Sequence, residues 1–395
     1  MRVTTPEISS RFDELLDRRG TDSIKWSLHD ADVLPMWVAD MDFRSAPPVV
    51  AALRARAEHG IYGYPAEPES LRGLIVERLQ RRFGWTIELD WIVWLPNVYA
   101  GFHLAAHAVT RPGDGALIHT PMYFPILGVP DAVGLRSQTA PLAYTADGQY
   151  ELDLDRTEAV LDGRSRLFIL CNPHNPVGRV YRRGELEELA ELSARHALVV
   201  CSDEIHADFV YSGHLHVPIA SVAPEIAART ITLMSPAKSF NLAGIPFAYA
   251  VIPDATLRDR YEKAKAGLVP HPGVFGFTAA VAAYQDGTAW LDELVAYLEG
   301  NRDTATTFLR ERIPQVRMTP LEGTYLAWLN CRGLGSGAPP YATLLEDGRV
   351  ATVDGDRFGE GGNGFVRVNL ACPRQRLLDG LERICASLER RRAAR

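Results

Sequence analysis

The stretch RLFILCNPHNPVGRVYRRGELEELAELSARHALVVCSD, residues 166–203, contains two apolar runs separated by an amphipathic pattern. The first run, RLFILC, leads into the turn CNPHNPVG. The pattern RGELEELAELSARH has the spacing of a helix with one buried face, and ALVVCSD is the second apolar run. Two buried strands joined by a helix of this length form a parallel pair. The stretch therefore predicts a parallel sheet covered by helices.

The same alternation continues on both sides of this stretch. Predicted strands are WIVWL, GALIHT, LRSQTAPL, RLFILC, ALVVCSD, ARTITLMS and FAYAVIP, with a helical pattern expected over FPILGVPDAV. We expect a large domain over residues 46–286 with a mainly parallel seven-stranded sheet between helices, an α/β fold. A long helix, two strands and a closing helix predict a smaller α+β domain over 287–395. Residues 1–45 are expected to pack on that smaller domain.

Composition restricts the class of protein. The net charge is −7 and basic residues are scattered, which argues against a nucleic-acid or membrane-surface partner. We find no signal-peptide pattern and no apolar run of the roughly 18 residues that span a bilayer. The 5 cysteines include no C-x-x-C pair, which favours free thiols in a reducing compartment. These features predict a cytoplasmic protein.

Polar residues follow five of the predicted strands at their carboxyl ends, where open α/β sheets bind ligands. They are the backbone N–H groups of Val98 and Tyr99 at a helix start, the tyrosine Tyr123, the amide Asn175, the acid Asp203, and the pair Ser235 and Lys238. Each alone has an ordinary explanation as a turn, a helix cap or a solvated charge. Those explanations do not predict the whole set in this order.

Pyridoxal 5′-phosphate requires this combination of groups. Lys238 would form the Schiff base with its aldehyde, and Asp203 would keep the pyridine nitrogen protonated. The remaining predicted contacts are Asn175 to the phenolic oxygen, Tyr123 stacked on the ring, and Ser235 with the helix start at Val98 on the phosphate. The sequence has no P-loop, dinucleotide fingerprint, nucleophile elbow or metal-ligand cluster, so we expect no metal.

The motifs HNPVG, SDE, SPAK and GFVRVNLA, in this order, resemble those of fold-type I pyridoxal-phosphate enzymes, the aspartate aminotransferase superfamily, over essentially the whole chain. LPMWVADMDF, CNPHNPVGRVY, SDEIHADFVY and SPAKSFNLAG further resemble the MalY/PatB branch of cysteine–sulfur β-lyases. The resemblance implies an aspartate aminotransferase-like fold and a homodimer with active sites at the subunit interface.

The resemblance also implies roles for residues that spacing alone does not identify. His206 would lie near the phenolic oxygen and Arg367 would bind the substrate α-carboxylate, as would the backbone at Ala39. Tyr64, with Tyr62 as a rival, would reach the neighbouring active site. Three positions depart from the family pattern: Asn97 stands where glycine is usual, the bulky Tyr99 stands where a small or aliphatic residue is usual, and Pro246 replaces a second phosphate-binding arginine of many aminotransferases.

The predicted reaction is the β-elimination of an amino-acid substrate, an L-cysteine S-conjugate, to a thiol, pyruvate and ammonia. Lys238, Asp203 and Tyr123 are the expected catalytic residues, with Lys238 taking the Cα proton. Reaction choice depends on substrate orientation, so other functions stay open at this point. They are an aminotransferase, a pathway-specific enzyme that decarboxylates or oxidatively deaminates an S-substituted cysteine, and a cofactor-bearing regulator that acts through a protein partner.

Overall fold

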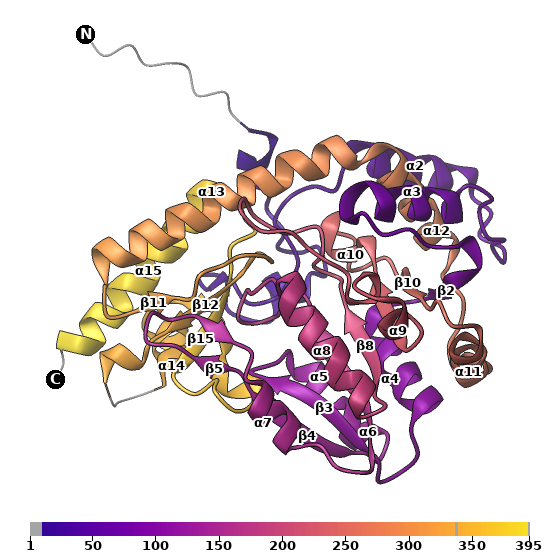
Figure 1. Ribbon diagram of the computed structural model, residues 1–395. Helices are drawn as coiled ribbons and strands as arrows, with labels where there is room; N and C mark the ends of the chain where they lie inside the picture. Colours follow the sequence, from indigo (N-terminus) through magenta and orange to yellow (C-terminus); the bar gives the residue numbers. More distant parts are fainter. Residues whose placement is uncertain (1–9, 336–338, 394–395) are drawn as a thin grey trace.

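The predicted α/β class is confirmed by the computed structural model, which describes residues 10–335 and 339–393 (Figure 1). A 7-stranded sheet has the order β2-β10-β9-β8-β7-β3-β4. Its strands are β2 (Ile92–Leu95), β3 (Gly115–Thr120), β4 (Arg136–Pro141), β7 (Ser165–Cys171), β8 (Val199–Asp203), β9 (Thr230–Met234) and β10 (Ala248–Val251). Strands β9 to β4 are mutually parallel, whereas β10 runs antiparallel to both of its neighbours. The sheet is therefore mainly parallel, as expected.

Helices cover both faces of this sheet. On β7, Leu167 and Ile169 pack in the same cluster as α4 (Val98–Val109), whereas Phe168 and Leu170 pack with α8 (Arg183–Arg195) on the opposite face. Successive side chains of a strand point to opposite faces. Burial on both faces explains why LFILC, residues 167–171, is continuously apolar rather than alternating.

Further helices connect and flank the strands. They are α1 (Ile24–Ser27), α2 (Pro47–His59), α3 (Leu71–Phe83), α5 (Phe124–Leu127), α6 (Val129–Ala132), α7 (Leu154–Ala159), α9 (Pro224–Ala227), α10 (Pro236–Ser239), α11 (Ala255–Lys265) and α12 (Val274–Asp286). The helical pattern over FPILGVPDAV forms two helices, α5 and α6, that meet at Gly128. Pro130 lacks the N–H that a continuous helix would need at that position, which explains the break.

The C-terminal part forms its own sheet. Four antiparallel strands have the order β11-β12-β15-β14. The elements after residue 287 are α13 (Thr288–Arg312), β11 (Arg317–Met318), β12 (Leu326–Asn330), α14 (Pro340–Glu346), β13 (Val350–Ala351), β14 (Val353–Asp354), β15 (Phe365–Asn369) and α15 (Arg374–Ala393). A separate small sheet pairs β5 (Ala143–Tyr144) with β6 (Tyr150–Glu151).

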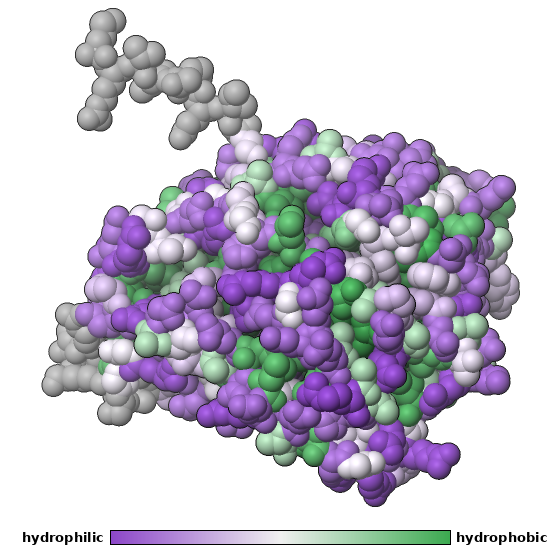
Figure 2. Space-filling model, viewed as in Figure 1, coloured by the Kyte–Doolittle hydropathy of each residue, from purple (hydrophilic) through white to green (hydrophobic). Residues whose placement is uncertain are grey.

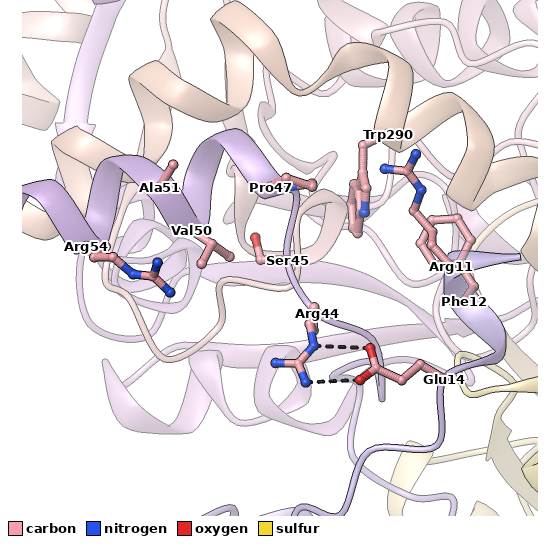
Figure 3. A pocket seen from close by; sticks show the side chains of 10 residues that line it. All are labelled: Arg11, Phe12, Glu14, Arg44, Ser45, Pro47, Val50, Ala51, Arg54 and Trp290. Atoms are coloured by element: carbon pink, nitrogen blue, oxygen red, sulfur yellow. Dashed lines mark hydrogen bonds and ion pairs between the residues drawn. The ribbon is translucent and has the colours of Figure 1, made fainter.

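The N-terminal segment lies against this C-terminal part. Strand β1 (Leu34–Pro35) pairs with β13, and the ring centroid of Phe12 lies 5.6 Å from that of Trp290. Beside Phe12, a pocket of about 390 Å³ opens between this segment, α2 and α13, where Arg44 donates two hydrogen bonds to Glu14 (Figure 3). We propose that the N-terminal segment ends at residue 45 and that the small domain begins at residue 287, and these contacts support the proposal. Residues 1–9 of the N-terminal segment lie outside the described residues.

The surface view is consistent with a buried apolar core. Figure 2 shows a mainly hydrophilic face with smaller apolar patches between the charged groups. Within the described ranges, no helix is long and apolar enough to cross a membrane. All 5 cysteines are buried.

Candidate active site

The carboxyl ends of the central strands bring the predicted residues together. Asp203 is the last residue of β8, and Lys238 lies on α10 directly after β9. The loop after β7 contacts the one after β3, because the Tyr123 N–H donates to the Asn175 carbonyl at 3.0 Å. Arg367 of β15 reaches the same place and donates from Nη1 to Asn175 Oδ1 at 2.9 Å. Groups from both sheets therefore meet in one site.

Lys238 is held in an environment that favours its neutral amine. Its Nζ donates to the carbonyl of Ala39 at 2.7 Å. Burial, followed by the positive charge of Arg367, lowers the pKa of Lys238 from 10.5 to about 8, and the carboxylates of Asp40 and Asp203 oppose this shift. A lysine with this pKa has a substantial neutral fraction near pH 7 and can act as a nucleophile or base.

Asp203 is a buried acid whose local partners only partly stabilise its charge. It accepts a hydrogen bond from the Ile205 N–H at 3.1 Å, and the thiol of Cys171 lies 3.9 Å from its Oδ2. Burial raises the pKa of Asp203 to about 7, while the Ile205 N–H and Lys238 lower it. A cationic ring nitrogen placed here would stabilise the carboxylate, which fits the predicted role.

Arg367 is a buried guanidinium that has no carboxylate partner among the described residues. Only 3% of the residue is exposed; Nη2 donates to the Trp37 carbonyl at 3.2 Å, and Nε has no hydrogen-bond partner within the described ranges. Burial lowers the pKa of Arg367 to about 10. Burying an unpaired charge is unfavourable, so this arrangement is suited to an anion such as a substrate carboxylate.

His206 and Tyr325 complete the buried side of the site. His206 is buried, its Nδ1 lacks a described partner, and burial lowers its pKa well below the ordinary value, so the ring is neutral. Its ring centroid lies 5.7 Å from that of Tyr325. The hydroxyl of Tyr325 donates to the Ala39 carbonyl at 2.9 Å, beside Lys238. Tyr325 is a residue of the site that the sequence analysis missed.

The start of α4 has free donors for an anion. Asn97 is the N-cap, and its Oδ1 accepts from the Ala100 N–H at 2.8 Å. The first N–H groups of a helix have no intrahelical partner, so those of Val98 and Tyr99 remain for a phosphate. Ser235 is also expected to contact the phosphate, but its hydroxyl already has two protein partners. It donates to the Phe247 carbonyl at 2.6 Å and accepts from the Ala237 N–H at 3.0 Å. Its contact to phosphate stays a prediction.

Two asparagines that sequence reasoning missed fix the segment carrying Ala39. Asn241 accepts from the Met41 N–H at 3.0 Å and donates to the carbonyls of Met41 and Phe43. Asn369 donates to the carbonyls of Val38 and Asp40 at 2.5 and 2.7 Å. Asn241 closely follows Lys238 in the chain, and Asn369 closely follows Arg367. The hydrogen bonds of the two asparagines therefore connect the Ala39 segment to the backbone beside both of these residues.

Within the described ranges, no hydrogen bond or ring contact joins Tyr64 or Tyr62 to Lys238, Asp203 or Arg367. Tyr64 is fully exposed, whereas the hydroxyl of Tyr62 donates to the Ala57 carbonyl at 2.7 Å and its ring lies 5.5 Å from Phe275. Both line a pocket of about 920 Å³ that also includes Pro246. Tyr99, which is 53% exposed, is a further large residue left uncovered in the single chain.

Comparisons with known proteins identify the family of the chain. The family model "Aminotransferase class I and II" matches residues 33–384. A cystathionine β-lyase, PatB of Bacillus subtilis (strain 168), is 38% identical over 386 residues, covering 95% of this chain and 99% of its own.

Two crystal structures are also similar over nearly the full length. A pyridoxal-phosphate-bound protein of Clostridium difficile 630 has a TM-score of 0.94 and 37% identity, covering 96% of this chain and 100% of its own. A protein named OvoB has a TM-score of 0.91 and 41% identity, covering 95% and 98%. With a lysine, an aspartate and a buried arginine converging at the ends of a mainly parallel sheet, the chain belongs to the class I and II aminotransferase family.

Proposed function

We propose that this protein is a pyridoxal-phosphate-dependent carbon–sulfur lyase that cleaves L-cysteine S-conjugates of the cystathionine type. Each substrate and one water would give a thiol, pyruvate and ammonium. The observation that carries the proposal is the similarity to the Bacillus subtilis cystathionine β-lyase, which extends over 95% of the chain. The convergence of Lys238, Asp203 and Arg367 supports it.

The residues present fit the cofactor. When bound, pyridoxal phosphate supplies an aldehyde for the lysine amine and a ring that accepts electrons from the substrate. Lys238 is a partly buried amine whose charge interacts with that of Asp203, an acid that burial leaves short of positive partners. Asn175 and His206 are the polar groups expected beside the phenolic oxygen, and the α4 N-terminus is the expected phosphate site.

In this proposal each side chain has a defined task. The guanidinium of Arg367 binds the α-carboxylate through Nε and one Nη, which orients the Cα–H bond toward Lys238. The neutral Lys238 amine accepts the Cα proton, and the Ala39 carbonyl keeps that nitrogen in place. Asp203 holds a proton at the ring nitrogen. The Cβ–S bond then breaks, and the thiolate leaves with the electron pair.

The proposal is tested by incubating the purified holoenzyme with L-cystathionine or S-alkyl-L-cysteines and measuring thiol and pyruvate. We expect equal amounts of both products, and no products from Lys238→Ala. Lys263→Ala is the matched control because Lys263 is exposed on α11, away from the site. Glutamate formation from 2-oxoglutarate without pyruvate would instead identify a transaminase.

We also propose a cytoplasmic homodimer in which Tyr64 of each subunit completes the site of the other. The full exposure of Tyr64 in the single chain, together with the apolar pocket beside it, supports this assignment. Mixing inactive Lys238→Ala with inactive Tyr64→Ala should restore activity, because each mixed dimer has one site with both residues intact. If the mixture stays inactive although mixed dimers form, Tyr64 acts within its own subunit. The corresponding experiment with Tyr62→Ala tests the rival residue.

A further inference from the structure

A second arginine, Arg357, lies near the substrate-binding arginine. It belongs to the 3-10 helix η5 (Gly355–Phe358). This helix is attached to the loop after β3, because the Met122 N–H donates to the Phe358 carbonyl at 2.9 Å. Tyr123, the residue expected on the cofactor ring, follows Met122 directly. Arg357 is therefore anchored to the same loop that carries a predicted catalytic residue.

An aromatic surface connects the two arginines. The Arg357 guanidinium lies 4.0 Å from the ring centroid of Phe124. That ring is 5.2 Å from Tyr123 and 5.8 Å from Phe358, and the guanidinium of Arg367 lies 5.1 Å from the Phe358 centroid. A substrate bound at Arg367 would thus have an aromatic wall beside it and a cation at the outer end of that wall.

No hydrogen bond or ion pair joins Arg357 to an acid within the described ranges; burial raises the pKa of Asp354, and the charge of Arg357 only opposes this shift. The side chain of Arg357 is exposed and makes no hydrogen bond or ion pair with a described residue. The nearest acids in its own turn have other partners: Asp354 accepts from the Asp356 N–H at 3.3 Å, and Asp356 accepts from Asn363 at 3.1 Å.

The two arginines also interact electrostatically. The charge of Arg357 contributes to the lowered pKa of Arg367, although burial is the larger cause. Two like charges repel each other, and an anion bound between them would relieve the repulsion.

We propose that Arg357 binds a second, distal carboxylate on the substrate and so selects S-conjugates with an anionic leaving group. This inference rests on the proposed function and adds the substrate class. The α-carboxylate would bind the buried Arg367, while the carboxylate beyond sulfur would bind the exposed Arg357. Phe124 positions the Arg357 guanidinium by a cation–π contact, which limits its freedom before the substrate binds.

The test compares S-(2-carboxyethyl)-L-cysteine with its neutral amide, S-(2-carbamoylethyl)-L-cysteine, which has the same shape. We expect kcat/KM for the acid to exceed that for the amide in the wild-type holoenzyme. Arg357→Gln should lower the value for the acid by about fivefold, the effect of one exposed ion pair, and leave the amide unchanged. Arg357→Lys should retain most of the preference. Arg332→Gln is the matched control, because Arg332 is also an exposed arginine on aromatic rings, those of Tyr144 and Phe365.

A binding experiment separates this inference from catalysis. Calorimetry with 3,3′-thiodipropionate, which has both carboxylates but no amine to react, should show weaker binding to Arg357→Gln than to wild type, and the difference should shrink with added salt. Equal binding, together with equal turnover of acid and amide, would overturn the role of Arg357 while leaving the lyase proposal intact. Failure of the wild type to release thiol and pyruvate from either conjugate would instead overturn the lyase function itself.

Discussion

The reactivity of Lys238 before cofactor binding gives a direct test of the site. Its pKa is lowered from 10.5 to about 8, first by burial and second by the charge of Arg367. At pH 7 a lysine with pKa 8 is neutral in about 10% of molecules, whereas an ordinary lysine is neutral in about 0.03%. The neutral amine is the reactive form. At this pH the structure therefore predicts that the reactive fraction of Lys238 in the apoprotein is roughly 300-fold larger than that of an ordinary lysine.

The assay is brief treatment of apoprotein with an amine-acylating reagent between pH 6 and 11, followed by peptide mass spectrometry. The modification rate at Lys238 should reach half its maximum near pH 8. Removing the neighbouring charge in Arg367→Gln should move this midpoint upward, because that charge disfavours the protonated amine. The exposed Lys263 provides a control for loss of reagent. A midpoint for Lys238 above pH 10, unchanged in Arg367→Gln, would refute the assignment of a buried, charge-coupled amine.

Three further outcomes are expected from stability measurements on the apoprotein. Burial raises the pKa of Asp203 from 3.8 to about 7. Between these pH values the unfolded state binds fewer protons than the folded state, so the free energy of unfolding falls as pH rises. Asp203→Asn should therefore be more stable than wild type at pH 8, by up to about 4 kcal/mol in urea titrations. Lys25 is buried and lies 3.2 Å from Asp42, so Lys25→Ala should cost about 3–5 kcal/mol in unfolding free energy, whereas Lys263→Ala should change it by less than about 0.5 kcal/mol. Asn241→Ala should cost about 2 kcal/mol, because three hydrogen bonds to the Ala39 segment are lost, and an unchanged unfolding midpoint would contradict this support role.

The parts of the site that sequence could predict are those with a local signal. Lys238, Asp203, Asn175 and Tyr123 each follow an apolar run, and the topology of a parallel sheet brings such positions together. Asn97 also has a local signal, since an asparagine before a helical pattern is a typical N-cap.

The remaining contacts join residues far apart in the chain. Ala39 meets Tyr325 across 286 positions, and Asn369 meets Val38 across 331. A periodic pattern within a window of about 20 residues cannot predict contacts between positions this far apart in the chain. The resemblance to a family assigned Arg367, but the free Nε of its buried guanidinium and the nearby Arg357 depend on tertiary packing.

The pairing of β1 with β13 has a consequence for the order of events during synthesis. The Ala39 segment receives its support from Asn369 and from a strand at residues 350–351, near the end of the chain. A ribosome must therefore translate residues 350–369 before this segment is fixed next to Lys238. Vitamin B6 loading is accordingly expected only after these residues have been synthesised, and nascent chains stalled before residue 350 should not retain it.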